Sequence, residues 1–168
     1  KPCRAVMGKI LGIGIPIAFQ DGLIQVAFII ITIIANQRGL NDAAAVGIVE
    51  KVISFLFLVP SSMLSTVSAL GAQNIGAGKP ERAIQTLRYA VMLAAGFGVL
   101  ASIAIQFTAE GIVSLFTDPS TADGAAVVRF GGQYLRGYIF DCIFAGIHFS
   151  FSGFFCACRK SGLSFLHN

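Results

Sequence analysis

The stretch Phe28-Ile-Ile-Ile-Thr-Ile-Ile-Ala35 is the clearest indication of the fold. It lies in an apolar segment from about residue 11 to residue 36, which contains one acid, Asp21, and no Lys or Arg. At roughly 1.5 Å per residue, a helix of this length crosses about 30 Å of hydrocarbon. The stretch therefore predicts a transmembrane helix.

The composition of the whole chain agrees with a membrane environment. Of its 168 residues, 55% are hydrophobic and 12% are charged, whereas a globular domain carries about 25% charged residues. The net charge is +4, but the basic residues lie at the ends of apolar runs and form neither a basic helix nor an aromatic platform. We therefore expect the lipid bilayer as a partner and no nucleic acid.

Turn-forming residues divide the chain into four apolar spans, at about residues 11–36, 43–70, 84–107 and 125–158. Residues 161–168 are expected to begin another helix. The predicted fold class is an all-α integral membrane bundle. Pro60 removes a backbone donor near the middle of the second span and predicts a helix hinge there. The fourth span is longer than a membrane needs, and Gly131, Gly132 and Gly137 are its predicted weak points.

The distribution of charge predicts how the spans are oriented. Four spans place both ends of the chain and the Gly-rich loop at 71–80 on one side. Most basic residues gather on that side: Lys1, Arg4, Lys9, Lys79, Arg82, Arg88, Arg159 and Lys160. The opposite side has the acids Asp118 and Asp123. We therefore expect both ends to be cytoplasmic. Because the chain begins at Lys1 without a signal-peptide pattern, we expect an interior piece of a longer protein.

Polar residues three or four positions apart form stripes on three of the spans. These stripes predict a wet cavity lined by residues of the first, second and fourth spans: Gln25, Thr32, Ser54, Ser61, Tyr138 and His148. An alternative for the serines is that they help helices to pack. The third span has no polar stripe between Ala90 and Ile105 and is expected to face lipid. Glu50 is expected to reach water at the end of its span.

Asp21 and Asp141 are the residues most strongly expected to carry function. A charged side chain at the bilayer centre costs about 2.5–3.5 kcal/mol on insertion scales. Either acid could bind a coupling cation, as a proton acceptor or as an oxygen ligand for sodium, or could be a structural carboxyl bonded to a neighbouring helix. His148 lies two turns beyond Asp141 and could relay protons or pack through a hydrogen bond.

Motifs for other chemistries are incomplete in this sequence. Gly71 and Gly76 have the glycine spacing of a P-loop, but Lys79 precedes Pro80 rather than Ser or Thr. Cys156 and Cys158 could form half of a metal site, but no second pair of ligands stands nearby. No nucleophile–base motif is present. We therefore expect no enzyme and no cofactor, apart from a coupling sodium ion or proton.

Three motifs resemble the MATE (multidrug and toxic compound extrusion) transporters over essentially the whole chain. The segment from Ser68 to Ala83, with Gln-Asn-x-Gly-Ala-Gly at its centre, resembles the family's cytoplasmic loop signature. Gly14-Ile-Pro-Ile-Ala-Phe-Gln20 resembles the start of its seventh helix. Tyr134-Leu-Arg-Gly-Tyr138, followed by Asp141 and Gly153, resembles its tenth. The resemblance implies the first part of the C-terminal lobe of a twelve-helix, two-lobe transporter.

The resemblance also implies a function for the parent protein, which is drug export in exchange for sodium or protons. Asp141 matches the acid of the family's tenth helix and would bind the coupling ion, sodium being one possibility. The seventh-helix Glu of the sodium-coupled branch has no acidic counterpart at Ile24 or Gln25, and Asp21 stands about one turn away. The expected location is the plasma membrane of a bacterial cell. The alternatives are a lipid-linked oligosaccharide flippase and a non-transporting membrane scaffold.

Overall fold

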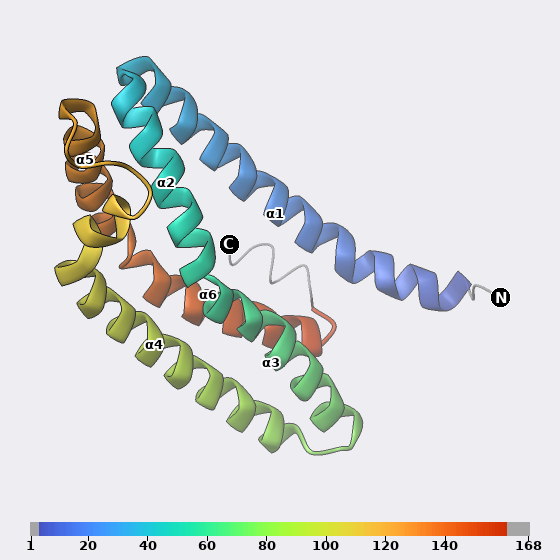
Figure 1. The fold of residues 1–168 in the computed structure, drawn as a ribbon. Helices are drawn as coiled ribbons and strands as arrows, with labels where there is room; N and C mark the ends of the chain where they lie inside the picture. Colours follow the sequence, from blue (N-terminus) through green and yellow to red (C-terminus); the bar gives the residue numbers. More distant parts are fainter. Residues whose placement is uncertain (1–3, 161–168) are drawn as a thin grey trace.

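A computed structural model describes residues 4–160, and the regular structure in this range is helical (Figure 1). In order, the helices are α1 (Arg4–Arg38), α2 (Leu40–Leu56), α3 (Leu58–Gly76), α4 (Pro80–Ser114), α5 (Ala122–Tyr138) and α6 (Asp141–Ala157). The predicted all-α membrane fold is confirmed. The helix start expected at 161–168 lies outside the described residues.

These helices provide three or four membrane spans. Residues 10–38, 40–76 and 80–114 are each long and apolar enough to cross a bilayer, and α5 with α6 makes a fourth span if the pair is counted as one. The axes of α5 and α6 differ by 41°. Most helices extend beyond their predicted bounds; α4, for example, begins at Pro80, because proline suits the first turn of a helix and lacks only a donor that has no helical partner there.

The second span is interrupted at Phe57, between α2 and α3. The Phe57 N–H still donates to the Ile53 carbonyl at 2.8 Å, and the Ser61 N–H donates to the Phe57 carbonyl at 2.9 Å. Pro60 is fully buried and has no N–H for the carbonyl of Leu56. The interruption therefore falls in the turn preceding Pro60, where the proline removes a helical hydrogen bond.

Small residues bring α6 into close contact with α3 and α4. A Cβ added to Gly98 would lie 2.8 Å from the Ile143 Cα, and a Cβ added to Gly146 would lie 2.8 Å from the Ala94 Cβ. Close approach through glycine and alanine is the usual way in which membrane helices associate, since burial of apolar surface gives no advantage in lipid. These contacts make α3, α4 and α6 the most tightly packed part of the described chain.

The expectation that the third span faces lipid holds for only one side of α4. That side exposes large apolar residues, namely Met92, Leu93, Leu100, Ile103 and Phe107. The opposite side is buried against α3, α5 and α6 through Ala83, Ala90, Ala94, Gly98, Ser102, Ile105, Ala109 and Val113. Residues at these spacings share one helix face, and their small size rather than polarity marks the packed side.

The long helix α1 packs mainly against α2, near the C-terminal end of α1 (Figure 1). Its N-terminal half stands away from the other helices, and apolar residues such as Ile10, Ile15 and Phe19 are exposed there. A second core lies between α2, α4 and α5 around Val49 and Leu135. Within residues 4–160, α2 to α6 thus form one bundle, and α1 packs against its outer edge.

Candidate functional site

Asp141 is the first residue of α6 and directly follows the bend at Ile139 and Phe140. The Cys142 N–H donates to the Ile139 carbonyl at 3.0 Å, and the Ile143 N–H donates to the Phe140 carbonyl at 3.2 Å, so the helix restarts with bonds spanning three residues. A helix N-terminus carries a partial positive charge that stabilises a carboxylate in its first turn. The bend thus places Asp141 at the electrostatically favourable end of a half-helix.

Asp141 is exposed and lines a cavity of about 300 Å³ between α1, Phe57 at the interruption of the second span, and the bent pair. The described residues lining the cavity are mostly aromatic or aliphatic: Ile24, Phe28, Phe57, Tyr138, Asp141, Phe144, Ala145, His148 and Phe149. His148 is close enough to Asp141 to interact with it electrostatically. A mostly apolar cavity with a few converging polar groups is typical of small-molecule sites.

Tyr138 links the aromatic residues on one side of this cavity. Its ring centroid lies 6.4 Å from that of Phe28, 6.1 Å from that of Phe57 and 5.8 Å from that of Tyr134. These tilted and edge-on arrangements are the favourable ones for aromatic pairs. The cluster joins α1, α5 and the interruption at Phe57, and it gives the cavity an aromatic wall beside Asp141.

Glu50 adds a second carboxyl beside this cluster. The Thr32 Oγ1 lies 3.1 Å from the Glu50 Oε1 and 2.9 Å from the Phe28 carbonyl oxygen. Because one hydroxyl has one hydrogen, Thr32 can donate to only one of these two oxygens at a time. Tyr134 and Tyr138 both lie within electrostatic range of Glu50, and the Tyr134 hydroxyl is buried without a hydrogen-bond partner in the described part of the chain.

The structure brings together only some of the residues that the stripes predicted. Tyr138, Asp141 and His148 line one cavity, and Thr32 contacts Glu50. Asp21 and Gln25 are exposed on α1, although Ile24 between them reaches the cavity. Their predicted roles stay predictions.

The two serines bond within their own helices, which is a common arrangement for mid-helix serine. The Ser54 hydroxyl donates to the Glu50 carbonyl at 2.7 Å, and the Ser61 hydroxyl donates to the Leu58 carbonyl at 3.2 Å. Sequence reasoning expected Glu50 to reach water because it lies near the end of its span. Its position in the stripe that contains Ser54 was the signal that it faces a neighbouring helix.

The comparisons with known proteins agree on one family. The family model MatE matches residues 16–167. The chain is 31% identical over 113 residues to "Probable multidrug resistance protein YoeA" of Bacillus subtilis, covering 67% of this chain and 24% of that protein. It is 31% identical over 121 residues to a protein of Shewanella oneidensis named "FAD transporter", covering 71% and 27%.

A third relative is "Multidrug resistance protein NorM" of Burkholderia vietnamiensis, 28% identical over 139 residues and covering 80% of this chain and 29% of that protein. The chain thus spans about a quarter of the length of these relatives. No solved structure matches it significantly. Since the family model covers residues 16–167 and the described helices form membrane spans, the chain is a multi-pass membrane protein that belongs to the MatE family.

Proposed function

We propose that the parent protein exports amphipathic, cationic drugs in exchange for sodium ions or protons, and that Asp141 binds the coupling cation. The observation that carries this proposal is the position of Asp141 at the start of a half-helix, facing an aromatic cavity. In membrane transporters, ion and substrate sites commonly lie where helices are discontinuous. An acid inside a span is also a functional candidate by default, because its burial is unfavourable.

The chemistry of the cavity supports a cationic substrate. Its described lining residues include aromatic rings and one acid, and no Lys or Arg. Aromatic faces attract organic cations, and a nearby carboxylate adds to that attraction. The relative named "FAD transporter" and the flippase alternative both suggest anionic substrates, for which basic residues would be expected. We therefore favour drug cations over anionic substrates.

Efflux of a fluorescent cationic dye by the full-length parent in membrane vesicles tests the proposal. A sodium gradient and a proton gradient are imposed separately on vesicles with and without the transporter. We expect dye efflux to follow one gradient, which identifies the coupling ion. Efflux under neither gradient contradicts the proposed function, and vesicles loaded with fluorescently labelled lipid-linked oligosaccharide then test the flippase alternative.

The contact between Thr32 and Glu50 predicts that Glu50 contributes to coupling. The substitution Glu50→Gln keeps the size of the side chain but removes its ability to gain or lose a proton. We expect the concentration of coupling ion at half-maximal efflux to rise about tenfold. This is the lower end of the loss in ion affinity seen when a residue that supports an ion-binding residue is replaced. The control is Ser54→Ala on the same helix, which removes only a bond to the helix's own backbone. Equal ion dependence in both variants would contradict a role for Glu50.

The interruption at Phe57 predicts that Pro60 serves as a hinge between inward- and outward-facing states. The substitution Pro60→Ala restores a donor for the Leu56 carbonyl and favours a straight helix by about 1 kcal/mol, or roughly fivefold. We expect a lower maximal efflux rate with unchanged dye affinity. The control is Pro80→Ala at the start of α4, where a restored N–H has no helical partner. An unchanged rate in Pro60→Ala would rule out the hinge.

The proposed orientation places both ends of the chain and the turn between α3 and α4 in the cytoplasm. That turn carries Lys79 and Arg82, and α6 ends beside Arg159 and Lys160. Basic residues at span ends favour the cytoplasmic side. In a bacterial plasma membrane, this orientation makes the connection between α4 and α5 face outward.

A further inference from the structure

No feature of α5 and α6 themselves fixes the angle of the bend between them. Residues 122–157 contain no proline, and Phe140 at the bend keeps helical dihedral angles of φ −62° and ψ −27°. Gly137 gives the backbone freedom but makes no packing contact, since a Cβ added there would meet no atom within 4 Å. A sharp helix bend otherwise arises where a side chain inserts into the hydrogen-bond ladder.

Two side chains of α4 bond to backbone carbonyls around this bend. The Gln106 Nε2 donates to the Arg136 carbonyl at 3.1 Å, and the Ser102 hydroxyl donates to the Ile139 carbonyl at 3.4 Å. Ser102 and Gln106 are four residues apart and so share one face of α4. The Ile139 carbonyl also accepts from the Cys142 N–H at 3.0 Å, so Ser102 adds a second, longer bond there. Gln106 supplies a donor to the Arg136 carbonyl beside the bend, where a carbonyl without a donor is unfavourable inside a membrane. The face of α4 therefore stabilises the bent form of the pair.

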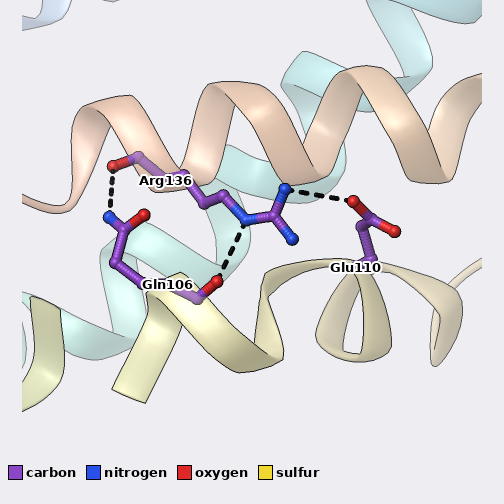
Figure 2. A network of polar contacts seen from close by, with 3 residues as sticks. All are labelled: Gln106, Glu110 and Arg136. Atoms are coloured by element: carbon purple, nitrogen blue, oxygen red, sulfur yellow. Dashed lines mark hydrogen bonds and ion pairs between the residues drawn. The ribbon is translucent and has the colours of Figure 1, made fainter. Parts of the chain in front are cut away.

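Arg136 makes this contact reciprocal (Figure 2). Its Nε donates to the Gln106 carbonyl at 3.2 Å, and its Nη1 lies 3.1 Å from the Glu110 Oε1. The helices can approach this closely because residue 132 is glycine: a Cβ there would lie 2.6 Å from the Glu110 Cγ. Arg136, Gln106 and Glu110 thus form a clamp between α4 and α5, one turn before the bend.

We propose that this clamp of Arg136, Gln106 and Glu110 positions Asp141 for ion coupling by fixing the bend between α5 and α6. Arg136 is held to α4, and Asp141 follows five residues later, directly after the bend. Release of Arg136 or Gln106 lets the pair straighten and moves the carboxyl relative to its cavity. The inference rests on the proposed function of Asp141 and extends it to three residues that lie outside the cavity.

The test compares Gln106→Leu and Arg136→Lys with the native full-length parent. Gln106→Leu removes the donor to the Arg136 carbonyl, and Arg136→Lys keeps the charge opposite Glu110 but not the forked geometry that reaches the Gln106 carbonyl at the same time. The matched control is Thr108→Ala on α4, because the Thr108 hydroxyl bonds only to the Ala104 carbonyl of its own helix.

The first readout is the distance across the bend. Spin labels at Arg129 on α5 and Arg159 after α6, both exposed, report this distance in a background without other cysteines. We expect a narrow distribution in the native protein and in Thr108→Ala, and a longer, broader one in Gln106→Leu and Arg136→Lys. Unchanged distributions in both clamp variants would overturn the proposal. Since this readout needs no transport, it also applies to a variant that is folded but inactive.

The second readout is dye efflux as a function of coupling-ion concentration. In the clamp variants we expect the ion concentration at half-maximal efflux to rise about tenfold, with dye affinity within about twofold of native. A loss of maximal rate alone, with unchanged ion dependence, would mean that the clamp is merely structural. If the native protein exports no dye under either gradient, the proposed function fails in the native protein itself, and the distances alone still decide whether the clamp sets the bend.

Discussion

Replacement of Asp141 by Asn is expected to abolish ion-driven efflux by the full-length parent while the protein stays folded in the membrane. Asparagine has nearly the same shape as aspartate, so the packing at the start of α6 is retained. The asparagine side chain does not accept a proton near neutral pH. It offers sodium one neutral oxygen in place of a carboxylate. Loss of the carboxylate charge is expected to weaken coupling-ion affinity by at least about tenfold, which corresponds to about 1.4 kcal/mol.

The measurement is the dye efflux rate in vesicles at several concentrations of the coupling ion, with the amount of transporter held equal. Dye binding in the absence of a gradient is measured in parallel. We expect binding to persist, because Phe28, Phe57 and Tyr138 still form the aromatic wall. A variant with native efflux would leave the antiporter possible but would remove Asp141 from the coupling site.

Two other aspartates provide the controls. Asp118 lies in the exposed connection between α4 and α5, where the Ser120 N–H donates to its carboxyl at 2.9 Å. This hydrogen bond holds the pKa of Asp118 below its usual range, so Asp118 stays ionised at the near-neutral pH of the assay and cannot supply a proton-dependent step. Asp118→Asn is therefore expected to be silent.

Asp21→Asn tests the second acid that the sequence offered as a coupling residue, after Asp141. Asp21 is exposed on the half of α1 that stands away from the bundle. If it binds the coupling ion, the loss should match that of Asp141→Asn. If only Asp141 binds the ion, Asp21→Asn should keep the native ion dependence.

The membrane spans were predictable from sequence because they depend on local composition. An apolar run such as Phe28–Ala35 specifies a membrane helix whatever its neighbours are. The break before Pro60 was predictable for the same reason, since proline lacks the donor wherever it stands. Asp141 was proposed as a coupling residue from its residue type and its place inside a predicted span, and this role stays a prediction.

The contacts from α4 at the bend between α5 and α6 could not be predicted in this way, because they involve a different helix. Gly131, Gly132 and Gly137 were the predicted weak points of the fourth span, and Gly137 lies beside the bend. Gly131 and Gly132 instead permit close packing: a Cβ on Gly131 would lie 3.0 Å from Val113, and one on Gly132 would meet Glu110. The bend falls later, where Gln106 and Ser102 bond to the backbone of the pair. The sequence of α5 and α6 does not contain this information.

The same reasoning explains why the polar face of α4 was missed. Ser102, Gln106 and Glu110 are spaced four residues apart, but the predicted span ended at Phe107, between the second and third of them. Because the predicted end of the helix divided this stripe, its three residues did not form a recognisable pattern. Its role depends on the carbonyls of Arg136 and Ile139 on the neighbouring pair, whose positions are properties of the folded structure.

Gly153 gives the second large expected effect, because α3 and α6 meet at this residue. A Cβ on Gly153 would lie 2.5 Å from the Leu64 carbonyl oxygen, 3.1 Å from the Leu64 Cα and 3.1 Å from the Val67 Cβ. Two of these three atoms belong to the backbone of α3, so a change of rotamer cannot relieve the clash. Gly153→Ala must therefore push the helices apart, and overpacking of this kind costs about 1–3 kcal/mol.

The matched control is Gly137→Ala in the same bent pair, where an added Cβ meets nothing within 4 Å. Both substitutions add one methyl group and the same helix propensity, so the difference between them isolates the contact with α3. We expect the temperature at which half the detergent-solubilised parent loses its monodisperse gel-filtration peak to fall for Gly153→Ala and to stay within error for Gly137→Ala. Equal midpoints would mean that α3 and α6 are not in close contact at Gly153, and the packing that supports Asp141 from the far end of α6 would then have to be different.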